Sequence, residues 1–208
     1  FGMQTENMYG TYFSNPLSDL IQNENYSRST QVYVNAFADI KLWKGLVFRT
    51  EYAANYNYNT GYRFTPSYDY EFFKQQSSAS RSAGNGSNWT LKTYLTYNGT
   101  FGKHNVSVMA GHEAQENNWE SLDGSRTNFL FNSVHELNAG DATTAKANSS
   151  RGSSAIESYF GRLNYNFADR YLLTATLRAD GSSSFAKESR WGWFPSVALA
   201  WKVNNEAF

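Results

Sequence analysis

Residues 158–180 read SYFGRLNYNFADRYLLTATLRAD, and this stretch decides the fold. Apolar and aromatic side chains recur at every second position on both sides of the turn at 168–170, whereas Arg178 and Asp180 fall on the intervening positions. Alternation with a period of two is typical of a strand with one apolar face. Two such strands joined by three residues predict a hairpin.

The same alternation recurs along the chain, and no stretch has a convincing helical period. Alternating strands are predicted at residues 30–42, 46–58, 88–97, 106–112, 158–167, 171–180 and 195–203. In the last of these, Val197 and Leu199 share one face, and Ser196 and Ala198 share the other. The sequence therefore predicts an all-β, antiparallel fold of about seven strands.

The connections between the predicted strands alternate in length. Short turns at 43–45, 98–105 and 168–170 alternate with long polar segments at 59–87, 114–155 and 181–193, and residues 1–27 resemble a fourth such segment. This alternation places every short turn at one edge of the sheet, as in outer-membrane barrels with short periplasmic turns and longer extracellular loops. We therefore expect an extracellular loop region at 1–27 and barrel strands with extracellular loops over 28–208.

Composition excludes several classes of protein. The 208 residues carry 18 basic and 18 acidic side chains and no cysteine, which argues against a nucleic-acid surface and excludes a disulfide scaffold. The longest apolar run, at 197–201, is far shorter than the about 20 residues of a membrane-spanning helix. Because the first residues include neither a Met start nor a signal-peptide pattern, we expect a processed form or part of a longer protein.

Large aromatic side chains cluster near the predicted strand ends, at Trp43, Tyr56, Tyr58, Trp89, Tyr171, Trp191, Trp193 and Trp201. Tyr and Trp favour the headgroup boundary of a membrane, because an apolar ring and a polar tip are both satisfied there. A soluble β-sandwich would use the same alternation to separate core from solvent. The asymmetry in loop length favours the barrel.

The last fifty residues carry a more specific signal. The hairpin quoted above runs into RADGSS at 178–183, RWGWFPSVALAW at 190–201 and Asn205-Glu206. Shorter pieces fit the same pattern, namely NAFA at 35–38, TFGKHN at 100–105 and AGHE at 110–113. Over most of residues 30–208 the chain resembles the SusC/RagA family of TonB-dependent outer-membrane transporters.

The resemblance implies a transmembrane β-barrel of about 22 strands, of which this chain would supply about seven. Family members are several times longer, and neither their plug domain nor their TonB box is recognisable in this sequence. The resemblance further implies import of oligosaccharides or oligopeptides across the outer membrane of a Gram-negative bacterium. The expected partners are a SusD-like surface lipoprotein, TonB acting through the missing N-terminal region, and the lipid and lipopolysaccharide of the outer membrane, with no nucleic acid.

Two alternatives stay open at this point. The chain could belong to an architectural SusC-like subunit of a larger outer-membrane complex that imports nothing. It could instead be a soluble carbohydrate-binding β-sandwich presenting Trp119, Trp191 and Trp193.

No enzyme, metal or cofactor is expected from the motifs. His112-Glu113 lacks the second His of a zinc-protease helix and falls on a predicted strand, and the remaining histidines are scattered. Alternation alone places five charged side chains toward the lumen as candidate ligand-binding residues, and these are Arg49, Glu51, Arg162, Arg178 and Asp180. Each could equally form a structural cross-strand ion pair or part of a hydrated wall.

Overall fold

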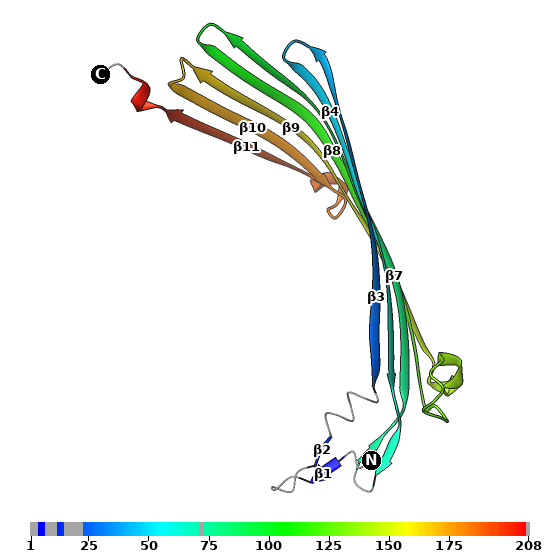
Figure 1. Cartoon of the computed structure of the whole chain (residues 1–208). Helices are drawn as coiled ribbons and strands as arrows, with labels where there is room; N and C mark the ends of the chain where they lie inside the picture. The colour runs from blue at the N-terminus through cyan, green and yellow to red at the C-terminus, as the bar shows by residue number, and fades with distance from the viewer. Residues whose placement is uncertain (1–3, 7–11, 15–22, 71–72, 207–208) are drawn as a thin grey trace. The chain divides into compact units, whose positions relative to one another are not determined.

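A seven-stranded sheet dominates the computed structural model, which describes residues 4–6, 12–14, 23–70 and 73–206 (Figure 1). Its strand order is β11-β10-β9-β8-β7-β4-β3, so each strand neighbours the one before it among these seven. The bounds are β3 Glu24–Trp43, β4 Leu46–Thr65, β7 Ser78–Phe101, β8 His104–Thr127, β9 Lys146–Phe167, β10 Tyr171–Ser182 and β11 Trp191–Trp201. The predicted all-β, antiparallel fold of seven main strands is confirmed.

Short elements complete the described part of the chain. Two small antiparallel hairpins pair β1 (Gln4–Glu6) with β2 (Tyr12–Ser14), and β5 (Tyr68–Tyr70) with β6 (Phe73–Gln75). Four single-turn 3₁₀ helices occur at η1 Leu137–Ala139, η2 Ala142–Thr144, η3 Lys187–Ser189 and η4 Val203–Asn205. Among the described residues, no helix has the length and apolar character of a membrane-spanning one.

The hairpins β3–β4, β7–β8 and β9–β10 close through turns of two or three residues (Figure 1). Gly45 and Gly102 adopt positive φ angles of 80° and 60°, which glycine tolerates without steric cost. Neighbouring hairpins are tied at these ends, because the Asn98 N–H donates to the Gly45 carbonyl at 2.8 Å and the Ala168 N–H donates to the Lys103 carbonyl at 2.7 Å. All three short turns therefore lie at the same edge of the sheet.

The expected loop boundaries need correction, because the strands continue into segments assigned to loops. Only residues 66–77, 128–145 and 183–190 separate the main strands where loops were expected at 59–87, 114–155 and 181–193. Within the expected loop 1–27, β1, β2 and the start of β3 are strand, and residues 1–3, 7–11 and 15–22 lie outside the described residues. A strand that is hydrated on both faces needs no apolar alternation, so its backbone ladder leaves no periodic signal in the sequence.

The chain divides into two compact units. The first, termed the loop unit, comprises residues 1–31, 57–86 and 119–151. Its small core contains Tyr62, Phe64, Ala79 and Phe129, and Phe64 packs edge-on against Phe129 with ring centroids 5.6 Å apart. The buried Ser77 hydroxyl accepts a hydrogen bond from the Phe129 N–H at 2.7 Å. These contacts order the segment that follows β8.

The second unit, termed the sheet unit, comprises residues 32–56, 87–118 and 152–208 and presents two different faces. Its apolar face is defined by Leu173, Leu177, Val197 and Leu199, and its polar face by Arg49, Glu51, Glu113 and Arg178. Val197 and Leu199 are 69% and 80% exposed, so the apolar face packs against no described part of this chain. Within the described residues no second layer covers these side chains, as one would in a soluble sandwich.

Aromatic rings mark two levels on the apolar face. Near the short turns, Tyr171 stacks on Trp201 with ring centroids 6.4 Å apart. Toward the opposite end of the strands, Tyr159 and Trp191 lie 5.9 Å apart. Trp201 lies ten positions after Trp191 on β11. At about 3.3 Å per residue and a strand tilt of about 40°, this offset corresponds to about 25 Å across the membrane. That spacing matches the apolar band of an outer-membrane barrel between its two aromatic girdles.

Candidate functional site on the polar face

A row of charged side chains, termed the ion-pair row, crosses the polar face from β3 to β10. Following the strand order, its members alternate in sign as Asp39, Arg49, Glu51, Lys92, Glu113, Arg178 and Asp180. Opposite charges on neighbouring strands attract one another across a sheet, whereas like charges directly opposite would destabilise it. The alternation of positive and negative side chains therefore stabilises the sheet itself, and it is equally compatible with ligand binding.

The β3–β4 end of the row is built around Arg49. Its Nη1 lies 3.2 Å from Asp39 Oδ2, and its Nε donates to Glu51 Oε1 at 2.5 Å. The Tyr94 hydroxyl on β7 donates to the same Glu51 oxygen at 3.1 Å. Arg49 and Glu51 are two residues apart on one strand, so the strand period places both on one face.

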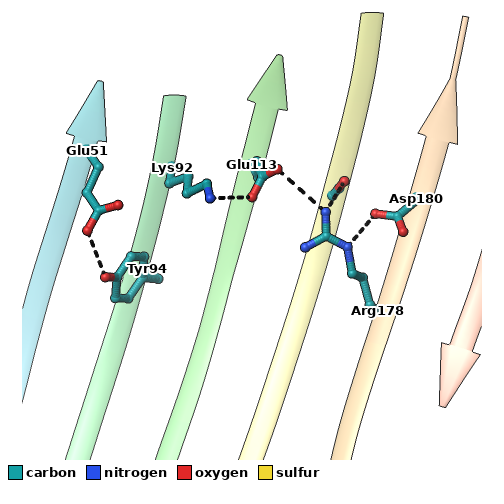
Figure 2. Close-up of polar contacts among 7 residues, drawn as sticks. Glu51, Lys92, Tyr94, Glu113, Arg178 and Asp180 are labelled. Carbon is teal, nitrogen blue, oxygen red and sulfur yellow. Dashed lines mark hydrogen bonds and ion pairs between the residues drawn. The ribbon is translucent and has the colours of Figure 1, made fainter. Parts of the chain in front are cut away.

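The β8–β10 end is built around Glu113 and Arg178 (Figure 2). Glu113 Oε2 lies 3.3 Å from Lys92 Nζ, and Glu113 Oε1 lies 3.6 Å from Arg178 Nη2. Arg178 also donates from Nε to Asp180 Oδ1 at 2.7 Å and from Nη2 to Ser158 Oγ at 3.0 Å. With its side chain 15% exposed, Glu113 is the least accessible charge in this half of the row.

Phe160 on β9 lies within the β8–β10 half of the row. It is directly opposite Arg178 in the β9–β10 register, and the Arg178 guanidinium carbon lies 5.8 Å from its ring centroid. On its other side the ring lies 6.4 Å from that of Tyr94. A Cβ at Gly111 would lie 2.7 Å from Phe160 Cζ, so glycine at position 111 leaves the space that this ring occupies.

Four of the five predicted lumen candidates belong to the row, and the fifth does not. Arg162 lies on the same face of β9 but donates from Nε to Asn164 Oδ1 at 3.3 Å. Asn164 Oδ1 also accepts from the Thr174 hydroxyl at 3.0 Å, which makes a separate polar group. Arg49, Glu51, Arg178 and Asp180 thus share one array, and Arg162 stands outside it.

The row combines internal ion pairs with accessible polar atoms. The side chains of Arg49, Glu51, Lys92 and Arg178 are between 35% and 42% exposed although each has an ionic partner. Partly exposed pairs of this kind contribute little stability, typically about 0.2–1 kcal/mol each. The polar face can therefore offer donors and acceptors to a hydrated solute without carrying a strong net field.

Sequence reasoning missed Asp39, Lys92, Tyr94, Glu113 and Ser158 as members of this array. The strand period of two could have identified Glu113, because it places Glu113 and Glu116, three positions later, on opposite faces of the strand. Glu116 faces the other way and accepts a hydrogen bond from Trp89 Nε1 at 3.2 Å. The pairing of Lys92 with Glu113 depends on the register between β7 and β8, which the sequence alone does not give.

Comparison with known proteins assigns the family. Residues 3–207 match the family described as TonB dependent receptor-like, beta-barrel. TonB-dependent receptor P3 of Formosa agariphila is 30% identical over 208 residues, covering 100% of this chain and 21% of the relative. TonB-dependent receptor SusC of Bacteroides thetaiotaomicron is 36% identical over 124 residues, covering 58% of this chain and 12% of the relative.

A solved structure confirms the fold. The structure of the RagAB peptide transporter superimposes with a TM-score of 0.88 and 22% identity, covering 97% of this chain and 23% of that chain. This chain thus spans about a fifth of the length of the curated receptor P3 and about a quarter of the transporter chain. A soluble carbohydrate-binding sandwich is excluded by these matches. The chain belongs to the TonB-dependent receptor β-barrel family, is similar to SusC and RagA, and forms part of an outer-membrane barrel of Gram-negative bacteria.

Proposed function

We propose that this chain is a wall segment of an active outer-membrane importer that takes up oligosaccharides or oligopeptides. The observation that carries the proposal is the division of the sheet unit into an exposed apolar face and a face crossed by the ion-pair row. In a membrane barrel the apolar face contacts hydrocarbon and the polar face lines a lumen. Names of similar proteins, including a peptide transporter, support import as the activity.

The ion-pair row suits solutes with many hydroxyl or amide groups. Its exposed guanidinium and carboxylate groups can donate to and accept from such solutes, and the row as a whole has nearly balanced charge. In this proposal a plug domain occupies the lumen, TonB pulls on it, and a SusD-like lipoprotein closes the outer side. Arg49, Glu51, Arg178 and Asp180 then contact the solute or the plug as it moves, and Arg162 lines the same wall.

Uptake measurements test the proposal. Cells that contain the native gene are compared with deletion cells for accumulation of fluorescently labelled oligosaccharides and oligopeptides of graded length. We expect accumulation of one class to be lost on deletion and restored by the complementing gene. Unchanged accumulation of every compound tested, with the protein present in the outer membrane of the wild type, would contradict import.

An architectural role is the second candidate, and the internal pairing of the row favours it. Every charged member of the row has an ionic partner within 3.6 Å, as a wall that binds nothing would require. Purification in mild detergent distinguishes the architectural role from import. A stable assembly with several other outer-membrane proteins, combined with unchanged uptake in the deletion strain, would indicate a structural subunit.

A further inference from the structure

Trp119 is an exposed aromatic side chain on the polar side of β8. It lies six positions after Glu113 on the same strand, so the strand period of two gives both side chains the same side of β8. Trp119 is 48% exposed, and within the described residues its ring and its indole N–H have no stacking or hydrogen-bond partner. The ring is therefore accessible to a solute.

Glycine leaves space beside this ring on the neighbouring strand. Gly84 of β7 faces Ser121 of β8, since a Cβ at Gly84 would lie 3.7 Å from Ser121 Cβ. Two positions along each strand, the antiparallel ladder places Gly86 opposite Trp119. A Cβ at Gly86 would lie 2.8 Å from Asn57 Nδ2. The Asn57 carboxamide thus lies over Gly86, and no side chain of β7 separates it from Trp119.

Small polar groups continue the same surface on the β9 side of the ring. Ser121 and Asp123 follow Trp119 by two and four positions and share its side of β8. Ser121 Oγ lies 2.8 Å from Ser150 Oγ, and Asn148 Nδ2 donates to Asp123 Oδ2 at 3.1 Å. Hydroxyl and carboxamide groups each form more than one hydrogen bond, so these exposed groups keep donors and acceptors for a solute.

A sugar ring has the chemistry that this surface complements. Its C–H groups form an apolar patch that packs on the electron-rich face of an indole ring, while its hydroxyl groups donate to and accept from the surrounding polar groups.

An oligopeptide matches the same surface less well. An extended peptide binds a sheet by adding a strand to an open edge, but β7 and β8 already have partners on both sides in the order β9-β8-β7-β4. Of the polar side chains around Trp119 named above, only Asp123 has a charge to pair with a peptide terminus or a basic side chain.

We propose that Trp119 stacks on a sugar residue of the solute and that the imported solute is accordingly an oligosaccharide. This proposal rests on the import activity proposed above and names its substrate class. Trp119 lies toward the end of β8 remote from the short turn, which is the outer side of an outer-membrane barrel. A solute that enters from outside meets this part of the wall before it reaches the ion-pair row.

Binding to two arrays tests the proposal with the full-length native protein purified in mild detergent. One array carries oligosaccharides of glucose, mannose, galactose and xylose in both anomeric linkages, and the other carries peptides of graded length. We expect the native protein to bind one class of oligosaccharide, and we expect Trp119→Ala to raise its dissociation constant about tenfold. Trp119→Phe keeps a ring and should recover most of the affinity, whereas Trp119→Leu keeps only apolar volume and should not.

Trp191→Ala is the matched control, because Trp191 is 47% exposed and lies on the apolar face. We expect it to bind with native affinity. Binding to peptides alone, binding to neither array, or equal oligosaccharide affinity in the native protein and Trp119→Ala would overturn the proposal.

Uptake by cells that contain each protein separates this proposal from import itself. Oligosaccharide binding that requires Trp119, in cells that accumulate no compound, would contradict import and still support stacking on Trp119. Accumulation of peptides, combined with binding to peptides alone, would contradict stacking on a sugar and leave import supported.

Discussion

Arg178 on β10 reaches Glu113 on β8, with Nη2 3.6 Å from Oε1, although β9 lies between the two strands. Adjacent strands are about 4.8 Å apart, so the long side chains must span about 10 Å. Phe160 on β9 lies beneath this contact, directly opposite Arg178. The contact ties three strands together on the polar face and makes Glu113 the junction of the row.

Removing the charge of Glu113 should weaken the row. Because Glu113→Gln takes an ionic partner from both Lys92 and Arg178, we expect the free energy of unfolding to fall by about 1 kcal/mol. Urea-induced unfolding of the native protein and the variant in lipid vesicles measures this difference in free energy. If the row contacts the solute, uptake should fall as well.

Glu116→Gln is the matched control, since Glu116 lies on the opposite face three residues away. We expect it to leave uptake unchanged. Equal loss of uptake in both variants would show that the polar face has no special part in transport.

Two glycines on neighbouring strands should respond differently to a methyl group. A Cβ at Gly111 would lie 2.7 Å from both Phe160 Cζ and the Thr93 carbonyl oxygen, whereas a Cβ at Gly161 meets nothing closer than 3.8 Å. We expect Gly111→Ala to destabilise the barrel by about 1–3 kcal/mol through overpacking, and Gly161→Ala to have little effect. Thermal unfolding of the two variants is monitored by the gel mobility of the protein. Equal melting temperatures would contradict the close packing around Phe160.

The turn glycines provide a second matched pair. Gly45 has a positive φ angle, and an added Cβ would collide with the Asn98 carbonyl oxygen, whereas the space around Gly102 is open. We expect Gly102→Ala to cost about 1 kcal/mol for its backbone conformation alone, and Gly45→Ala to cost about 3 kcal/mol. Similar unfolding free energies for the two variants would contradict the close approach of the two hairpins at this edge.

The turn at Asp169 should make part of the stability depend on pH. The hydrogen bond from Lys202, reinforced by Asn166, lowers the pKa of Asp169 below its ordinary value. A carboxylate whose pKa is lowered by folding stabilises the folded state at every pH above the ordinary aspartate pKa of about 3.9. This stabilisation is lost as the pH falls through the lowered pKa of the folded state.

Asp169→Asn is the appropriate variant, since Asn tolerates the positive φ angle of 55° at this position. We expect the melting temperature of the native protein to exceed that of the variant at pH 7 and the difference to shrink by pH 3. A difference that stays constant over this range would rule out ionisation of Asp169 as its source.

The sequence predicted the sheet wherever one face meets hydrocarbon. From Tyr171 to Ala179, alternate positions must be apolar, and the period of two follows from that requirement. In the loop unit the same backbone ladder carries small or polar residues on both faces, as at residues 82–86 of β7. The strand extensions therefore left no pattern, and loops were expected in their place.

The candidate site divides in the same way. Local pairs such as Arg178 and Asp180 follow from strand parity, because they lie two residues apart on one strand. Pairs across strands, such as Lys92 and Glu113, depend on register, which is set by the turns and by packing along the whole sheet. The strand period identifies the face on which a side chain lies, but not its partner on another strand.

Placing one arginine on each face of β11 tests most directly which face contacts hydrocarbon. Val197 and Ser196 are neighbours midway between the two aromatic levels, and they lie opposite Ala175 and Thr176 of β10. Unfolding free energy in lipid vesicles is measured for Val197→Arg and Ser196→Arg. We expect Val197→Arg to lose about 2–4 kcal/mol, the cost of arginine at the bilayer midplane, and Ser196→Arg to lose little. A larger loss for Ser196→Arg than for Val197→Arg would reverse the two faces and contradict the account.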